Sequence, residues 1–305
     1  MNRLFLACCL SCAVLLGCSS PDVTKLEEGL ALMLNSFPGD TGIYVKHLGS
    51  GKEIAIRADS LFPTASMIKV PIMLKIFDRI DKGELTYQQE LIYKDSLFYS
   101  DEDIVGEFRD SASVFLSEAA MLSISNSDNT ASLWLQELAG TGVAINQWLH
   151  DHGFKGTRMN SRTPLRRGDW EKYGWGQTTP REMARLVEMI RNGEAVSPAA
   201  SEEMYRVLTR SYWNDEALSQ IPPYVQVASK QGAVSASKSE VVLVNAPSGD
   251  YLFCIITNNQ ADTRWEYDNQ GAVLIRAVSK LLWDTFEPNQ PYTPTEGFDR
   301  YNGSN

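Results

Sequence analysis

The period of the apolar positions changes along the chain. Residues 21–37 carry apolar side chains at helical spacing, and residues 41–58 read as two strands around a Gly-Ser-Gly turn. The apolar run from Met67 to Ile80 is hydrophobic on nearly every side, which predicts a helix buried in the middle of a domain. Pro71 lies inside this run, and we expect it to disturb the first turns of that helix.

Helical spacing dominates from Ser117 to Arg210. Three segments in this stretch repeat their apolar residues with the helical period, and two of them stop at a glycine. Residues Thr179 to Glu182 form a predicted capping box with proline at the first helical position. Ser197 is predicted to open another helix in the same manner.

Strands are predicted again near the end of the chain. The apolar period falls to two in residues 224–229, 239–246 and 250–257, and a Pro-Ser-Gly turn joins the last two. A final helix is predicted over residues 270–286. Strands at both ends with helices between them predict a mixed α+β fold, in which the N-terminal and C-terminal segments form one antiparallel sheet covered by helices.

We expect a single domain over residues 18–286. Its α/β lobe is predicted from residues 22–60 and 215–286, and an all-helical lobe over residues 66–212 is inserted between them. A site is expected in the seam between the two lobes. Residues 287–305 are rich in proline and polar side chains, which predicts disorder.

The first 17 residues have the pattern of a signal peptide, with one arginine followed by an apolar segment too short to span a bilayer. The segment ends in Leu-Leu-Gly-Cys, which resembles a bacterial lipobox. We therefore expect cleavage before Cys18 and a lipid on Cys18 that anchors the protein to a membrane of the bacterial cell envelope, facing the periplasm or the exterior. The alternative is an ordinary signal peptide in which Cys18 is incidental.

Composition restricts the partners. The 305-residue chain has a formal net charge of -10 and no run of lysine and arginine, so nucleic acid is not expected as a partner. A small-molecule or peptide substrate fits better, and we expect a monomer. After cleavage only Cys18 and Cys254 remain, so no internal disulfide is expected, and the apolar neighbours of Cys254 predict an inert core thiol.

The sequence motifs of several common classes of enzyme are missing from this chain. Its three histidines are His47, His150 and His152, and the last two, two residues apart on a helix end, do not share a face. There is no H-E-x-x-H, no cysteine-rich site, no G-x-S-x-G and no glycine-rich phosphate loop. We expect neither a metal nor a cofactor.

Ser66 and Lys69 are the first candidate for chemistry. On a helix, the i, i+3 spacing puts both side chains on one face, and the serine lies at the helix start, where free N–H groups favour a developing anion. Burial of Lys69 would lower its pKa and make it a usable base. The alternative is that Ser66 caps the helix and Lys69 extends to water. Ser235 and Lys238 repeat this spacing but precede a strand, so we do not expect them to form a catalytic pair.

Two further motifs follow the first in order. Residues Ser127, Asp128 and Asn129 lie between two predicted helices, and Lys230-Gln231-Gly232 stands at the end of a predicted strand. The ordered set S-x-x-K, S-D-N and K-[TS]-G is the signature of class A β-lactamases and penicillin-binding proteins. The sequence resembles the class A β-lactamase family from about Thr41 to Phe286. The resemblance implies a β-lactamase/transpeptidase-like fold.

The resemblance also implies roles for the matching residues in acyl transfer. Ser66 would be the acylated nucleophile, Lys69 its base, and Ser127 the donor of a proton to the leaving nitrogen. Asn129 would hold the substrate amide. An alternative for the Ser127 segment is a helix-capping turn, which the same residues could serve.

The third motif would bind the substrate. Lys230 would attract the substrate carboxylate and tune Ser127, with Gly232 beside it in the motif. The backbone N–H groups of Ser66 and Ala233 would form the oxyanion hole. Gln231 departs from the family, because it replaces a threonine or serine whose hydroxyl would bind the carboxylate.

The larger departure concerns the base that activates the deacylating water. The family carries a glutamate in an E-x-x-L-N loop, and gap-free alignment from Thr157 to Pro180 puts Thr163 at that position. A threonine cannot serve as that base. Asp169 and Glu171 are nearby carboxylates that could substitute, although solvated loop charges are the simpler interpretation.

Three functions therefore compete. The leading hypothesis is a serine hydrolase of β-lactamase type, acylated at Ser66 by a β-lactam or related amide. A second is a D,D-peptidase or esterase acting on cell-wall fragments, because such peptidases also lack the deacylating glutamate. A third is a penicillin-binding or sensing lipoprotein without turnover.

Overall fold

The computed structural model describes residues 23–297 of the chain. The predicted signal peptide and Cys18 lie outside these residues, as do residues 298–305 of the predicted tail. Within the described part, no helix has both the length and the apolar character needed to cross a membrane.

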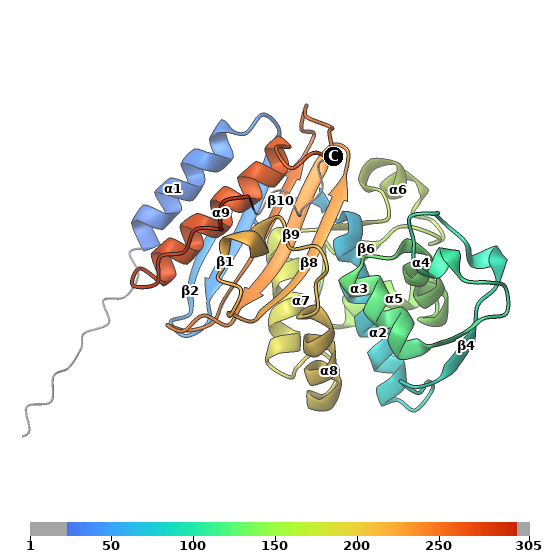
Figure 1. Cartoon of the computed structure of the whole chain (residues 1–305). Helices are drawn as coiled ribbons and strands as arrows, with labels where there is room; N and C mark the ends of the chain where they lie inside the picture. The colour runs from blue at the N-terminus through green and yellow to red at the C-terminus, as the bar shows by residue number, and fades with distance from the viewer. Residues whose placement is uncertain (1–22, 298–305) are drawn as a thin grey trace, which may run out of the picture.

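A five-stranded sheet forms the centre of the structure (Figure 1). Its strand order is β2-β1-β10-β9-β8, and every neighbouring pair is antiparallel. The N-terminal strand β1 pairs with the C-terminal strand β10 from Asp40 opposite Asn258 to His47 opposite Tyr251. This confirms the predicted sheet built from both ends of the chain. The strands are β1 Asp40–His47, β2 Lys52–Ile56, β8 Val227–Val234, β9 Ser237–Val244 and β10 Tyr251–Asn258.

Two helices cover one face of the sheet, α1 Val23–Ser36 and α9 Gln270–Phe286, which lie side by side (Figure 1). The buried residues of α1 are Leu26, Leu30 and Leu34, spaced every four positions, so a single stripe of this helix faces the core. Alternate residues of the strands meet these helices, as the period of two predicts.

The other face of the sheet packs against the helical part of the chain. Helix α7 contacts β1, β9 and β10 directly, and α2 contacts α3, α4, α5 and α8 around it. These helices are α2 Lys69–Asp81, α3 Leu116–Ser125, α4 Asn129–Leu138, α5 Thr141–Asp151, α6 Arg167–Tyr173, α7 Pro180–Arg191 and α8 Pro198–Leu208. Short strands complete the described part: β3 Phe62–Pro63, β6 Arg158–Met159 and β7 Gly176–Thr178 form one small sheet, and β4 Glu90–Ile92 and β5 Ser113–Phe115 form another.

Helix α2 has the buried character that its apolar run predicts, since nine of its residues from Lys69 to Asp78 are buried. It does not begin at Met67 as an α-helix. A 3-10 helix, η1, runs over Ala65–Ile68, and the α-helix starts at Lys69. Pro71 therefore lies in the first turn of α2, where the missing N–H removes no regular helical bond.

The predicted capping box at α7 is only half formed. The Thr179 side chain accepts a hydrogen bond from the Glu182 backbone N–H, as expected of a capping residue. The Glu182 carboxylate does not return to the Thr179 backbone, because it accepts bonds from the backbone N–H groups of Lys155, Gly156 and Thr157. Glu182 thus ties α7 to the start of β6.

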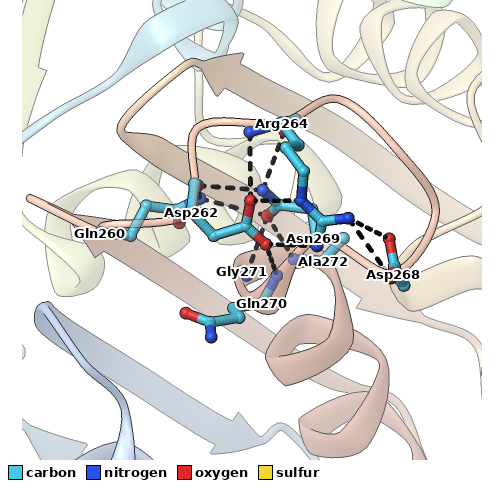
Figure 2. A network of polar contacts seen from close by, with 8 residues as sticks. All are labelled: Gln260, Asp262, Arg264, Asp268, Asn269, Gln270, Gly271 and Ala272. Carbon is cyan, nitrogen blue, oxygen red and sulfur yellow. Dashed lines mark hydrogen bonds and ion pairs between the residues drawn. The ribbon is translucent and has the colours of Figure 1, made fainter.

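A polar network fixes the loop between β10 and α9 (Figure 2). Asn269 caps α9 by accepting bonds from the backbone of Gly271 and Ala272, and it also accepts a bond from the Gln260 amide. Asp262 pairs with Arg264 at 3.0 Å in the same loop. The N-terminus of α9 is therefore held against the sheet.

The C-terminal segment after α9 is less free than its composition predicts. The Glu287 carboxylate accepts bonds from the Ser248 backbone and hydroxyl, and the Trp283 indole donates to the Gln290 carbonyl. Tyr292 packs against the apolar core beneath α1 and α9. The beginning of the predicted tail is thus bound to the fold by contacts that its sequence pattern does not reveal.

Candidate active site

Three segments that are far apart in sequence meet at the predicted site. They are the turn from η1 into α2, the turn between α3 and α4, and the middle of β8, which packs against η1. The two amines, of Lys69 and Lys230, are buried with exposed fractions of 0% and 2%. Ser66, Ser127 and Asn129 are half-buried. The basic groups thus form the floor of the site, and the hydroxyl and amide groups remain accessible.

Lys69 lies at the centre of a hydrogen-bonded cluster. Its amine donates to the Ser127 carbonyl, to the Ser127 hydroxyl at 3.0 Å and to the Asn129 side-chain oxygen at 2.7 Å. Burial, aided by the nearby charge of Lys230, holds the pKa of Lys69 well below its usual range, while Asp103 and Asp128 oppose this shift. Lys69 is therefore buried rather than extended to water, and its lowered pKa favours the neutral amine that a base requires.

Ser127 bridges the two amines. Its hydroxyl is 3.0 Å from the Lys69 nitrogen and 3.0 Å from the Lys230 nitrogen. A hydroxyl can donate one hydrogen bond and accept others, so it can pass a proton between such neighbours. Ser127 has a left-handed backbone with φ of 61°, and Ala65, just before Ser66, has φ of 43°. Both serines are thus presented by backbone that non-glycine residues rarely adopt.

Two buried carboxylates hold the Ser127 turn. Asp128 caps α4 by accepting a bond from the Ala131 backbone N–H at 2.7 Å, and it also accepts one at 2.8 Å from the backbone N–H of Val105, outside that helix. Asp103 accepts bonds from the backbone of Asn129 at 2.8 Å and Thr130 at 2.9 Å. Ser127 to Asn129 therefore do form a capping turn, and the same turn presents the Ser127 and Asn129 side chains to Lys69.

Lys230 lies in the interior of β8, not at the end of a strand as the sequence pattern suggested, because the strand continues to Val234. Burial lowers the pKa of Lys230 to about 7. Its amine donates to Ser127 and to the carbonyl of Gln231 at 2.9 Å. The Gln231 side-chain nitrogen is buried and has no hydrogen-bond partner within the described part of the chain.

Gly232 explains how β8 can approach the nucleophile turn. A Cβ atom at this position would lie 2.4 Å from the Thr64 carbonyl oxygen and 3.1 Å from the Met67 nitrogen. Only glycine therefore lets the β8 backbone lie against the residues on either side of Ser66. The predicted oxyanion donors, Ser66 and Ala233, lie next to this contact in the chain.

The loop between β6 and β7 contains the position where a water-activating base is expected. Its ends meet, since the backbone N–H groups of Asn160 and Ser161 both bond the Trp175 carbonyl. Thr163 is half-buried, and its hydroxyl donates to the Ser161 carbonyl at 2.9 Å. The hydroxyl thus closes a local turn of this loop.

The two carboxylates that could substitute for that base are paired with arginines. Asp169 forms an ion pair with Arg166 at 2.9 Å, and Glu171 forms one with Arg167 at 2.7 Å. Both therefore behave as loop charges.

The second serine and lysine pair belongs to β9 and its hairpin. Ser235 precedes the strand, which starts at Ser237, and the Lys238 amine lies 3.7 Å from the centre of the Trp265 ring. Neither residue joins the Lys69 cluster in the described contacts. Cys254 is fully buried in β10 and, as expected, is a core thiol.

Sequence reasoning missed two residues that shape the site. Asp103 contacts residues 26 and 27 positions downstream, and no local motif marks it. Glu240 on β9 lies opposite Gln231 and accepts a bond from the Ser229 hydroxyl at 2.5 Å. Burial raises the pKa of Glu240 to about 7. Among residues 23–297, no three His, Cys, Asp or Glu side chains gather as a metal site requires.

Comparisons with known proteins bear on the family and the fold of the chain. A family model described as "Beta-lactamase enzyme family" matches residues 25–286. Beta-lactamase VEB-1 of Pseudomonas aeruginosa is 22% identical over 256 residues, which cover 80% of this chain and 85% of the relative.

Solved structures have the same fold. PBP-A superposes with a TM-score of 0.77 at 26% identity, covering 87% of this chain and 97% of that chain. An acyl-enzyme complex of a PBP-A mutant with penicillin G gives the same values. A class A beta-lactamase from Mycobacterium abscessus has a TM-score of 0.75 at 20% identity, covering 86% and 99% of the two chains. The predicted β-lactamase/transpeptidase-like fold is confirmed.

Proposed function

The chain belongs to the beta-lactamase enzyme family and is a serine hydrolase that works through an acyl-enzyme, and we propose that Ser66 carries the acyl group. The observation that carries this proposal is the buried Lys69 amine, which lies three residues after a half-buried serine and has a lowered pKa. Among the described contacts, Lys69 donates to Ser127 and Asn129 and not to Ser66. Catalytic hydrogen bonds often form only when the substrate is bound.

Acylation follows from the positions of the two amines and the Ser127 hydroxyl. Neutral Lys69 takes the proton from the Ser66 hydroxyl as its oxygen attacks the substrate carbonyl. Ser127 then gives a proton to the leaving nitrogen, and the bond between carbonyl carbon and nitrogen breaks. The proton that Lys69 gained replaces the one that Ser127 lost, because the two groups are 3.0 Å apart.

The oxyanion that develops in this step is stabilised by the backbone N–H groups of Ser66 and Ala233. Their approach depends on Gly232, whose missing side chain lets β8 lie against Thr64 and Met67. Donors fixed in advance are worth more than mobile ones, because they need no reorganisation when charge develops.

The proposed acyl donor is a β-lactam or a related amide. The penicillin G acyl-enzyme of the PBP-A mutant supports this class, as does the beta-lactamase name of the Pseudomonas relative. Asn129 would hold the substrate amide, and protonated Lys230 would attract a substrate carboxylate. Gln231 offers an amide in place of the family's hydroxyl, which weakens carboxylate binding.

Deacylation is proposed to be slow. Thr163 at the expected base position has no carboxylate, and Asp169 and Glu171 are held by arginines. Two other carboxylates, Asp103 and Asp128, act electrostatically on Lys69. Both already accept hydrogen bonds from backbone N–H groups. General-base assistance is typically worth about 10²- to 10⁴-fold. If this assistance is missing from deacylation while Lys69 still serves acylation, deacylation is the slower step and the acyl-enzyme accumulates.

The absence of a carboxylate at Thr163 also favours a second candidate function. A D,D-peptidase or esterase acting on cell-wall fragments transfers the acyl group without the deacylating glutamate. A penicillin-binding or sensing lipoprotein would retain the acyl group without turnover. Hydrolysis of nitrocefin and of a peptide ending in D-Ala-D-Ala, measured side by side, separates these from a β-lactamase.

Labelling by a fluorescent penicillin tests the nucleophile. Ser66→Ala should abolish labelling, because the attacking hydroxyl is lost. Ser235→Ala is the matched control, since it removes the other serine that precedes a lysine at the same spacing, and it should leave labelling intact. Labelling that survives in Ser66→Ala would remove the nucleophile assignment.

Cys18 is proposed to anchor the protein to a membrane of the bacterial cell envelope. Its support is the Leu-Leu-Gly-Cys ending of the signal-like segment. A Cys18→Ser form should fail to incorporate labelled palmitate and should leave the membrane fraction. Recovery of the unaltered protein in soluble, unlipidated form would overturn the proposal.

A further inference from the structure

A surface segment links the Ser127 turn to the sheet. We propose that Trp213, in the segment of residues 209–217 that we name the strap, is a positioning residue that holds Ser127 in place between Lys69 and Lys230. The strap follows α8 and leads into the 3-10 helix η4, Ala217–Gln220. This inference rests on the proposed function only for its effect on activity, because the contacts themselves are structural.

One end of the strap bonds the two residues that precede Ser127. The Tyr212 backbone N–H donates to the Ser125 carbonyl at 3.0 Å, and the Trp213 indole N–H donates to the Asn126 carbonyl at 3.0 Å. The Tyr212 and Trp213 rings meet edge to face with centres 5.1 Å apart. The strap thus holds the end of α3 just before Ser127, whose backbone is left-handed.

The other end of the strap is fixed to the sheet. The Ala217 backbone N–H donates to the buried Glu240 carboxylate at 2.9 Å, and the Ala217 carbonyl accepts from the Ser279 hydroxyl on α9 at 2.7 Å. Glu240 also accepts from Ser229, the residue before Lys230. Ala217 therefore binds the Glu240 carboxylate only four positions after Trp213 binds Asn126, and Glu240 in turn holds the strand that carries Lys230.

This arrangement matters because Ser127 and Lys230 come from opposite sides of the site. Their 3.0 Å contact depends on the spacing between the α3–α4 turn and β8. Ser127 has a φ of 61°, a conformation that the surrounding structure must maintain. Trp213 is 44% exposed, so it adds little to the core, and the indole bond is its specific contribution. Loss of this bond lets the turn move relative to Lys230.

Trp213→Phe is the direct test, because it keeps an aromatic ring beside Tyr212 and removes the indole donor. The second-order acylation rate constant with benzylpenicillin should fall about 3- to 10-fold, the effect of one lost neutral hydrogen bond. Tyr212→Leu is the matched control. It removes the neighbouring ring but keeps the backbone N–H that bonds Ser125, so its rate constant should stay within about twofold of wild type.

A second background separates positioning from general destabilisation. In a Ser127→Ala background, where Ser66 and Lys69 remain, adding Trp213→Phe should lower the acylation rate constant no further, since Trp213 acts through the Ser127 hydroxyl. Hydrogen exchange of the peptide containing residues 122–131 should also be faster in Trp213→Phe than in wild type or Tyr212→Leu.

The outcomes distinguish this inference from the proposed function. A wild-type protein that forms no adduct at Ser66 contradicts the proposed function, while faster exchange in Trp213→Phe would still support the contact role of the strap. An adduct that forms at an unchanged rate in Trp213→Phe overturns the inference alone. Equal losses in the wild-type and Ser127→Ala backgrounds also overturn it, because Trp213 would then act independently of Ser127.

Discussion

Replacement of Gly232 by alanine tests whether the close packing of β8 on the nucleophile turn is needed for acylation. The added Cβ would lie 2.4 Å from the Thr64 carbonyl oxygen, 2.7 Å from the Ser239 hydroxyl and 3.1 Å from the Met67 nitrogen. Ordinary van der Waals contacts of a Cβ atom begin at 3.4 Å, so β8 and the turn must separate by about 1 Å. The carbonyl is backbone and cannot rotate away.

The cost to acylation follows from that displacement. A misplacement of about 1 Å can cost about 10²-fold in rate, and removal of one oxyanion donor costs about 10²- to 10³-fold. We therefore expect Gly232→Ala to lower the second-order acylation rate constant about 10²-fold, measured by stopped-flow with a fluorescent penicillin. Overpacking also destabilises by typically about 1–3 kcal/mol, so the assay is run well below the melting temperature of the variant.

Gly168→Ala is the matched control for this substitution. A Cβ at Gly168, in α6, meets no atom within 4 Å. The control should acylate at the wild-type rate. A folded Gly232→Ala protein that acylates within about threefold of wild type would refute the role given to this contact.

Three further predictions concern charge. The rate of acylation by benzylpenicillin should fall above about pH 7, because Lys230 then loses the proton that attracts the substrate carboxylate. In a pH–rate profile, Lys230→Arg should abolish this decline, since arginine stays protonated. An unchanged decline in that variant contradicts the assignment. Burial raises the pKa of Glu240 to about 7, so the native state keeps a proton that the unfolded state releases between about pH 4.5 and 7. The free energy of unfolding should therefore fall as pH rises through this window. Measured by urea unfolding, this fall should be smaller in Glu240→Gln than in wild type by about 1–3 kcal/mol. Equal pH dependence in the two proteins would count against a raised pKa. Asp103→Ala should destabilise the protein by about 1–3 kcal/mol, because it leaves backbone N–H donors at the start of α4 unpaired. Asp110→Ala, at an exposed position, is the control and should cost less. Similar melting temperatures for the two variants would argue against this role of Asp103.

The sheet and most helices could be predicted because their residues repeat with a clear period. The final helix runs over Gln270–Phe286, as the apolar spacing predicted. The extent of β8 was not predictable in the same way. Its last five residues, Lys230 to Val234, contain a buried lysine, a glutamine and a glycine, which suit the site and do not form an alternating apolar pattern. Function thus overrides the strand signal at the position where the chemistry lies.

The motif residues of the site could be found from their spacing and order, and the structure gathers Lys69, Ser127, Asn129 and Lys230 into one hydrogen-bonded cluster. Their supporting residues could not be found. Asp103 reaches the α4 start only through tertiary folding, because nothing local to it marks its partners. Glu182 matches a capping box locally, yet its carboxylate binds three N–H groups of a distant loop, which a local rule cannot anticipate. Residues that build a site through long-range contacts leave no periodic signal.

The central claim is that Ser66 forms an acyl-enzyme that accumulates because no carboxylate stands at the position of Thr163. Intact-mass spectrometry of the protein mixed with excess benzylpenicillin measures this directly. We predict an adduct of one penicillin per chain, absent from Ser66→Ala, that persists while steady-state turnover stays slow after an initial burst. Rapid multiple turnover with no detectable adduct would contradict it, and would mean that another group, such as Asp169 or Glu171, activates the water.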